Sequence, residues 1–174
     1  DVAITTPDWI ASLALAGRAP FDKPLRLRAI ANFPHDDRMI FAVRKSLGLR
    51  SFRDILDQRY PLKVSTPLRE TNHSGAWAAE RVMNAYGFGF DAIESWGGKV
   101  LRDRPRMLSG GGAAVSEDFD AIFDEAIMTL RWKTLTENED LIFLSIDEDV
   151  LKQLEAEGWR RGVIPKNHFR GIDD

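Results

Sequence analysis

The feature of this sequence that most constrains its fold is a series of short apolar runs that alternate with longer amphipathic stretches. Each run has about the length of a β-strand and is bounded by glycine, proline or charged residues. Strands that alternate with helices form α/β folds, in which the helices cover a largely parallel sheet. We therefore predict an α/β protein with strands at residues 1–4, 25–30, 39–43, 62–65, 93–96, 119–123 and 141–144.

Capping residues mark where the predicted helices begin and end. Thr6, followed by a proline, favours a helix at residues 7–16, because a hydroxyl can accept a hydrogen bond from a free N–H group of the first turn. Ser51 with Asp54 approximates a capping box for a short helix. Two further helices are expected, one at residues 75–86 that stops at Gly87 and one that begins at Ser145 or Asp147 and ends at Gly158.

Composition narrows the classes of partner. The 174 residues carry 27 acidic and 24 basic side chains without a run of like charge, so neither nucleic acid nor a lipid surface is an expected partner. The absence of cysteine excludes disulfides, thiolate metal sites and cysteine nucleophiles. No stretch approaches the ~20 apolar residues of a membrane-spanning helix. The chain begins at Asp1 on a predicted buried strand, without a methionine, and we expect that upstream sequence precedes it.

Several segments together resemble a family of transport receptors. The string LRAIANFPHDDR at residues 27–38, VSTP at 64–67 and YGF at 86–88 resemble the solute receptors of the TAXI type. These receptors serve TRAP transporters and are related to receptors of the thiamine-precursor and sulfonate class. WGGK at residues 96–99 and DAIFDEA at 120–126 extend the similarity.

The resemblance implies a type 2 periplasmic-binding-protein fold, in which two α/β lobes are joined by hinge strands and the ligand is trapped between them. It implies that residues 1–38 are a remnant of lobe one, residues 39–160 are a complete three-layer α/β ligand-binding lobe two, and residues 161–174 return across the hinge. The first strand and loop of lobe one, rich in small residues in the family, are missing from this chain.

The implied function is that of a periplasmic receptor subunit rather than an enzyme. It would capture a small anionic organic solute, a carboxylate or an amino-acid-like compound, by lobe closure and present it to membrane transporter subunits. No cofactor, metal, nucleic acid or direct membrane insertion is expected. Two alternatives use the same fold: the effector-binding domain of a transcription regulator and a cytoplasmic enzyme. An upstream secretory signal would favour the receptor, whereas an upstream helix-turn-helix segment would favour the transcription regulator.

Ligands of open α/β sheets bind beyond the carboxyl ends of the strands, and this rule selects the candidate site. The main candidate is the loop before the helix at residues 75–86, because a cation and several donors there adjoin a helix N-terminus that favours a carboxylate. The complete set of candidate ligand-binding residues is Thr5, Thr6, Thr66, Arg69, Thr71, Asn72, His73, Ser74, Trp96, Asp124 and Glu125.

Each candidate also has a structural interpretation. Asn72 or Ser74 would then only cap the helix, and Arg69 would be solvated. Acidic residues such as Asp124 and Glu125 are more often on the surface, and a tryptophan such as Trp96 is more often packed in a core.

Enzyme motifs are incomplete. The glycines at residues 110–112 lack the lysine of a phosphate-binding loop, and no Gly-x-Ser-x-Gly elbow is present. His35, His73 and His168 are far apart in sequence, without a partner at the helical spacing of metal ligands.

Overall fold

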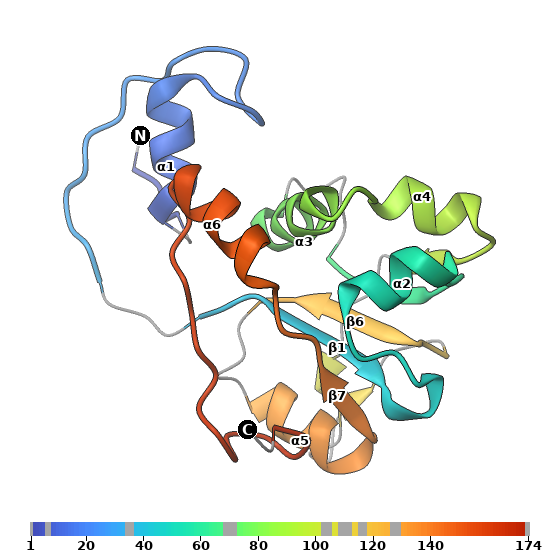
Figure 1. Cartoon of the computed structure of the whole chain (residues 1–174). Helices are drawn as coiled ribbons and strands as arrows, with labels where there is room; N and C mark the ends of the chain where they lie inside the picture. Colours follow the sequence, from blue (N-terminus) through green and yellow to red (C-terminus); the bar gives the residue numbers. More distant parts are fainter. Residues whose placement is uncertain are drawn as a thin grey trace. The chain divides into compact units, whose positions relative to one another are not determined.

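The computed structural model describes residues 2–5, 8–33, 37–67, 73–101, 106–107, 113–114, 118–125 and 130–172 (Figure 1). The chain divides into two compact units, Asp1–His35 and Asp36–Asp174. The second unit contains the β-sheets and every described helix except α1 (Asp8–Ala16).

Five strands of the second unit form one mixed sheet in the order β3-β2-β6-β1-β7. β2 is parallel to β3 and to β6, whereas β1 is antiparallel to β6 and to β7. The strands are β1 (Ile40–Arg44), β2 (Lys63–Ser65), β3 (Lys99–Leu101), β6 (Ala121–Asp124) and β7 (Leu141–Phe143). A second, two-stranded sheet pairs β4 (Arg106–Met107) with β5 (Ala113–Ala114).

The predicted α/β class is confirmed, and the prediction of a largely parallel sheet is wrong at β1. The other four strands of the large sheet point one way, and β1 runs against both of its neighbours. The alternation of strands and helices could not reveal this. Strand direction depends on pairing with residues some 80 and 100 positions away, as when Ala42 pairs with both Ile122 and Phe143.

Helices cover both faces of the large sheet. Apolar residues of α2 (Phe52–Gln58), α3 (Ser74–Ala85), α4 (Phe90–Ser95) and α6 (Glu148–Ala156) form one core cluster with the first face. α5 (Leu130–Asn138) and the C-terminal segment pack against the other face. A short 3-10 helix, η1 (Lys45–Leu47), follows β1.

Side chains of the central strands alternate between these two core clusters, as the two-residue period of a strand requires. Phe41 and Phe123 belong to the cluster with α2, and Ile40 and Ile122 to the cluster with α5. The rings of Phe41 and Phe123 lie 5.2 Å apart edge to face, and the ring of Phe52 lies 5.0 Å from that of Phe41. These aromatic contacts join α2 to the sheet.

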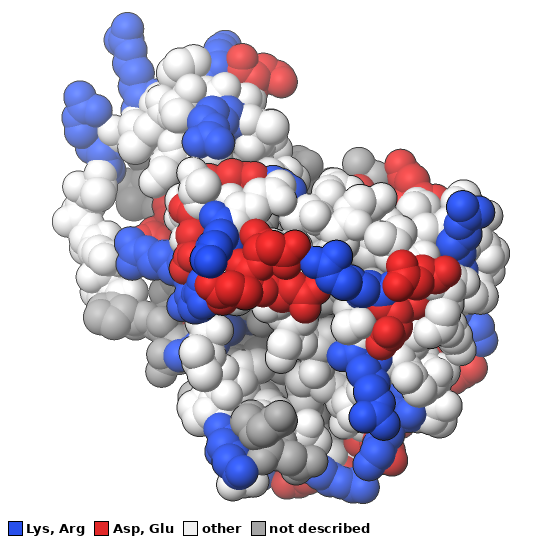
Figure 2. All heavy atoms as spheres, in the orientation of Figure 1, with Lys and Arg blue, Asp and Glu red and all other residues white. Residues whose placement is uncertain are grey.

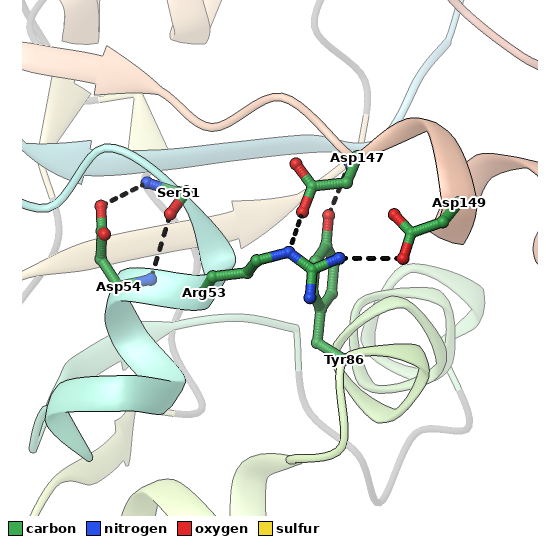
Figure 3. Close-up of polar contacts among 6 residues, drawn as sticks. All are labelled: Ser51, Arg53, Asp54, Tyr86, Asp147 and Asp149. Carbon is green, nitrogen blue, oxygen red and sulfur yellow. Dashed lines mark hydrogen bonds and ion pairs between the residues drawn. The ribbon is translucent and has the colours of Figure 1, made fainter.

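Polar contacts join α2 to α6 (Figure 3). The Ser51 hydroxyl accepts the N–H of Asp54 and the Asp54 carboxylate accepts the N–H of Ser51, which confirms the predicted capping box. One residue into the helix, the Arg53 guanidinium donates to Asp147 at 2.7 Å and to Asp149 at 2.9 Å. The N–H of Asp147 donates to the Tyr86 hydroxyl at 2.7 Å. The exposed ion pairs contribute little stability, so these contacts mainly set the position of α6.

One predicted strand is wrong at α4. Residues 93–96, expected as a strand, lie in α4 and its C-cap, and β3 follows instead at residues 99–101. Phe90 and Ile93 are buried at a spacing of three, which is a helical period. Gly98 lets the backbone before β3 pass close to the backbone of Leu62, because a Cβ there would lie 2.5 Å from the carbonyl oxygen of Leu62.

The first unit contains α1, which confirms the predicted helix at residues 7–16 over its described part. The capping residues Thr6 and Pro7 lie outside the described residues. Residues 2–4 and 25–30, predicted as strands, belong to no described strand. Val2 and Ile4 are 81% and 97% exposed, so the prediction that this segment is a buried strand is wrong within the described chain.

Truncating Phe123 tests the aromatic contacts of the core. We expect Phe123→Ala to lower the free energy of unfolding by about 3–5 kcal/mol, because it leaves a cavity between two aromatic rings. Urea denaturation measures the change. Leu130→Ala, at a residue that is 66% exposed, is the control and should cost less than about 1 kcal/mol. Equal losses in the two variants would contradict the assigned core.

The capping box makes stability depend on pH. The hydrogen bond from the N–H of Arg50 holds the pKa of Asp54 below its ordinary value of 3.8. A depressed pKa in the folded state adds stability above the ordinary pKa, and this stability is lost as the pH falls through the folded value. We expect Asp54→Asn to cost roughly 1 kcal/mol at neutral pH and progressively less below pH 3.8. Asp57→Asn, at an exposed residue of the same helix outside the capping box, is the control and should change the free energy of unfolding by less than about 0.5 kcal/mol at neutral pH. Urea denaturation at neutral pH compares the two variants, and further measurements at lower pH follow Asp54→Asn.

Candidate functional site

Polar side chains gather where β2 and β6 end. The two strands are parallel, and Ser65 of β2 pairs with Ile122 of β6, so their carboxyl ends lie at the same edge of the sheet. Thr66 follows β2, and its N–H donates to the carbonyl of Leu101 at the end of β3. β6 ends with Asp124, and Glu125 comes next. The carboxyl ends of three neighbouring strands therefore form one edge.

Burial sets this edge apart from the rest of the described chain. Four described polar or charged residues are buried, namely Ser65, Thr66, Asp124 and Thr136. The first three lie at the carboxyl edge of the sheet. The hydroxyl of Thr136 donates to the carbonyl of Lys133, but the Oγ1 atom of Thr66 is buried without a hydrogen-bond partner among the described residues. An unsatisfied buried hydroxyl costs about 1–3 kcal/mol of desolvation.

Asp124 is fully buried on the α5 side of the sheet. Its Oδ1 atom accepts the N–H of Glu125 at 2.7 Å, and its Oδ2 atom lies 3.5 Å from Nη2 of Arg131 in the first turn of α5. A buried carboxylate is tolerated only when it is paired and hydrogen-bonded. Arg131 therefore holds the end of β6 against α5.

His73 and Glu125 meet at the start of α3. Nδ1 of His73 accepts the N–H of Gly75, so His73 is the N-cap of the helix, and Nε2 lies 3.6 Å from Oε1 of Glu125. Because Nδ1 accepts, the proton of the neutral ring is assigned to Nε2, which faces the carboxylate. A Cβ on Gly75 would lie 3.4 Å from Cδ of Glu125. The glycine thus leaves room for the carboxylate at the positive end of the helix dipole.

The chain also enters the second unit near this edge, and the segment that follows α6 passes the same place. β1 begins at Ile40, which pairs with Asp124 at the end of β6. After α6, the ring of Trp159 stacks on that of Trp77 in the first turn of α3, with centroids 6.0 Å apart and planes 12° apart. Three residues later, a Cβ on Gly162 would lie 3.2 Å from Cδ of Arg38, which precedes β1. The segments before β1 and after α6 therefore lie side by side.

The structure brings together part of the predicted site. Thr66, His73, Ser74, Asp124 and Glu125 all lie at the carboxyl edge or at the start of α3. His73 caps α3, the role that the structural interpretation gave to Asn72 or Ser74. The predicted residues Thr6, Arg69, Thr71 and Asn72 lie outside the described residues.

Two predicted residues lie elsewhere. Thr5 is exposed in the first unit. Trp96 is the C-cap of α4, where its ring packs 5.7 Å from that of Phe88, and it precedes β3 rather than following a strand. Its selection rested on the predicted strand at residues 93–96, which is wrong.

Sequence reasoning missed Ser65 and Arg131. A serine inside a short apolar strand was a signal that could have been used. Arg131 had no comparable signal, because its pairing with Asp124 depends on how α5 packs on the sheet.

Acidic side chains gather on the surface over α6, and basic side chains pair with them (Figure 2). Arg161 pairs with Glu148 at 2.8 Å and with Glu155 at 3.1 Å. These hydrogen bonds raise the pKa of Arg161 and lower that of Glu148. No three acidic, histidine or cysteine residues of the described chain are grouped as metal ligands. No described helix has the length and apolar character needed to cross a membrane.

Comparison with known proteins adds no assignment. Neither a scan against protein-family models nor a search of curated proteins finds a match to this chain.

Replacing Thr66 tests whether its hydroxyl is a cost to the unliganded protein. We expect Thr66→Val to leave stability unchanged or raise it by about 1 kcal/mol, because the methyl group removes an unsatisfied buried polar atom. Thr136→Val is the matched control and should lose about 1 kcal/mol, because that hydroxyl is hydrogen-bonded. Thermal and urea denaturation of both variants measure the difference. Destabilisation of Thr66→Val comparable to that of Thr136→Val would show that Thr66 has a partner.

Proposed function

We propose that residues 39–160 form the ligand-binding lobe of a two-lobed solute receptor with a type 2 periplasmic-binding-protein fold. The observation that carries this proposal is the group of buried polar side chains at one sheet edge, Ser65, Thr66 and Asp124, with His73 and Glu125 beside them. Burial of polar groups is costly, and such groups are found where function requires them. The carboxyl edge is also where open α/β sheets bind ligands.

The path of the chain supports a second lobe facing this edge. Two chain segments lie against each other there, one before β1 at Arg38 and one after α6 at Gly162. A pair of adjacent connections can act as a hinge, since a few residues at the ends of elements absorb the rotation between two lobes. A lobe carried on these connections would close over the carboxyl edge.

The groups at the edge suit a small organic acid, amino acids included. His73 and the first turn of α3 favour a carboxylate, while Glu125 favours an amine. Contacts made only in the closed state would shift the population toward closure. The resemblance to TAXI-type receptors supports a role in the periplasm, where the closed receptor would deliver its solute to membrane transporter subunits.

Ligand screening of the full-length protein tests this function. We expect at least one carboxylate or amino acid to raise the melting temperature, because a ligand at 100 times its Kd stabilises the folded state by about 2.7 kcal/mol. Thermal shift against a panel of mono- and dicarboxylates, amino acids and amines identifies it, and calorimetry gives its Kd. The receptor function would be overturned if no compound of the panel stabilised the protein and the protein catalysed the turnover of one of them.

Two variants locate the site. Thr66→Val and Glu125→Gln should each raise the Kd of that ligand by roughly tenfold or more, since a lost hydrogen bond to a charged group costs about 1.5–3 kcal/mol. Glu94→Gln, which makes the same change at an exposed residue of α4, should leave the Kd unchanged. Thr66→Val is expected to fold at least as stably as the natural protein, so weaker binding by this variant cannot result from unfolding. Unchanged affinity in both site variants would move the site away from this edge.

A further inference from the structure

The two acidic residues at the end of β6 have different surroundings. Asp124 is fully buried, whereas the side chain of Glu125 is 18% exposed. Because Phe123 faces the core cluster that contains α3, the next side chain, Asp124, faces α5. There its Oδ1 atom accepts the N–H of Glu125 at 2.7 Å, and its Oδ2 atom lies 3.5 Å from Nη2 of Arg131. Both oxygens of Asp124 therefore have partners within the protein, on the face away from the start of α3.

The hydrogen bond between Asp124 and the N–H of Glu125 fixes the backbone at this point. It joins a side chain to the next peptide group and so sets the orientation of the peptide from which the Glu125 side chain departs. The contact between Oε1 of Glu125 and Nε2 of His73 is 3.6 Å, which is longer than a hydrogen bond. The place of the Glu125 carboxylate at the start of α3 therefore depends on the backbone that Asp124 holds.

Stability does not account for the pairing of Asp124 with Arg131. The two side chains are 0% and 19% exposed, so both charges have lost most of their hydration. The attraction within a buried pair is largely offset by this desolvation, and apolar residues of similar size are often as stable in its place. Removing one partner leaves a buried charge, so the pair keeps its two groups together. It is suited to holding a strand end in place rather than to strengthening the fold.

We propose that Asp124 and Arg131 are positioning residues of the candidate site, which hold the Glu125 carboxylate in place for a ligand ammonium group without touching the ligand. This role rests on the proposed function, in which Glu125 binds the amine of the solute. It changes the predicted role of Asp124 from a ligand contact to a support of its neighbour. Binding groups need such support, because they must be held within about 0.5 Å of the productive geometry.

Replacing both members of the pair together gives the test variant. Asp124→Leu/Arg131→Met removes both charges and the acceptor of the Glu125 N–H, and the net charge of the protein stays the same. Neither partner is then left as an unpaired buried charge. The matched control is Arg44→Met/Glu139→Leu, a pair whose side chains are 28% and 30% exposed. The N–H of Arg44 donates to the carbonyl of the residue before β6, so this pair lies at the opposite edge of the sheet.

Ligand pairs that differ only in the amine separate positioning from a general loss of structure. Calorimetry on the full-length protein compares L-leucine with 4-methylpentanoate and L-alanine with propionate. We expect the double variant to raise the Kd of the amino acid by about tenfold or more, as Glu125→Gln does. The Kd of the carboxylate without an amine should change by less than about threefold. Equal weakening of both ligands, or unchanged binding of the amino acid, would overturn the positioning role.

Asp124→Asn is a smaller change for the same measurements. It removes the charge that faces Arg131 and keeps the shape of the side chain, so it should give the same pattern with a smaller increase in the Kd of the amino acid. Equal effects on the two ligands of a pair would count against positioning in this variant as well.

A further combination shows whether the pair acts through Glu125. Changes that act through one contact are not additive. Glu125→Gln should therefore raise the Kd by less than about threefold when it is added to Asp124→Leu/Arg131→Met, against about tenfold in the natural protein. A second tenfold increase would mean that the pair and Glu125 act independently, and the positioning role would be wrong.

Crystal structures of the full-length protein and its variants give a measurement that needs no ligand. The Glu125 carboxylate should leave its place beside His73 in Asp124→Leu/Arg131→Met and keep it in the control pair. A carboxylate that keeps its place in the double variant would overturn the positioning role, even in a protein that binds amino acids. Displacement of this carboxylate in a protein that binds no solute would retain the support of Glu125 by the pair and remove the proposed function.

Discussion

Backbone pairing of β6 on both of its edges is the constraint from which the arrangement of the site follows. β6 is parallel to β2 on one side and antiparallel to β1 on the other, and all four of its residues are buried. Its end is therefore held in one position. Because successive strand residues point to opposite faces, Asp124 faces α5 and meets Arg131, while the next residue, Glu125, meets His73 at the start of α3. One strand end thus places a carboxylate on each face.

Buried polar groups at this edge oppose the stability that the core provides. Asp124 is compensated by a backbone N–H and by Arg131, whereas the hydroxyl of Thr66 has no partner among the described residues. Thr136 shows that this fold can satisfy a buried threonine when a helical carbonyl is near. A hydroxyl left unsatisfied at a strand end is a stability cost that a bound ligand can remove, and sites that trade stability for function have this character.

Predictions from the sequence are most accurate for structure that depends on residues close together in the chain. The capping box of Ser51 and Asp54 is formed within four residues, and its prediction is confirmed. The direction of β1 depends on partners about 80 and 100 residues away, and it was predicted wrongly. At the candidate site, the positions of Thr66 and Glu125 after strand ends were predicted from the sequence. Arg131 and the capping role of His73 were not, because they depend on how helices pack against the sheet.

Under the proposed receptor function, the carboxylate of Glu125 bears on which solutes would fit the edge. A helix N-terminus attracts an anion, and at α3 a glycine allows the chain's own carboxylate to approach that position. A dianionic ligand would bring a second carboxylate toward Glu125, and like charges at close range repel. A solute that carries an amine beside its carboxylate offers an opposite charge to Glu125 and is therefore favoured over a simple dicarboxylate.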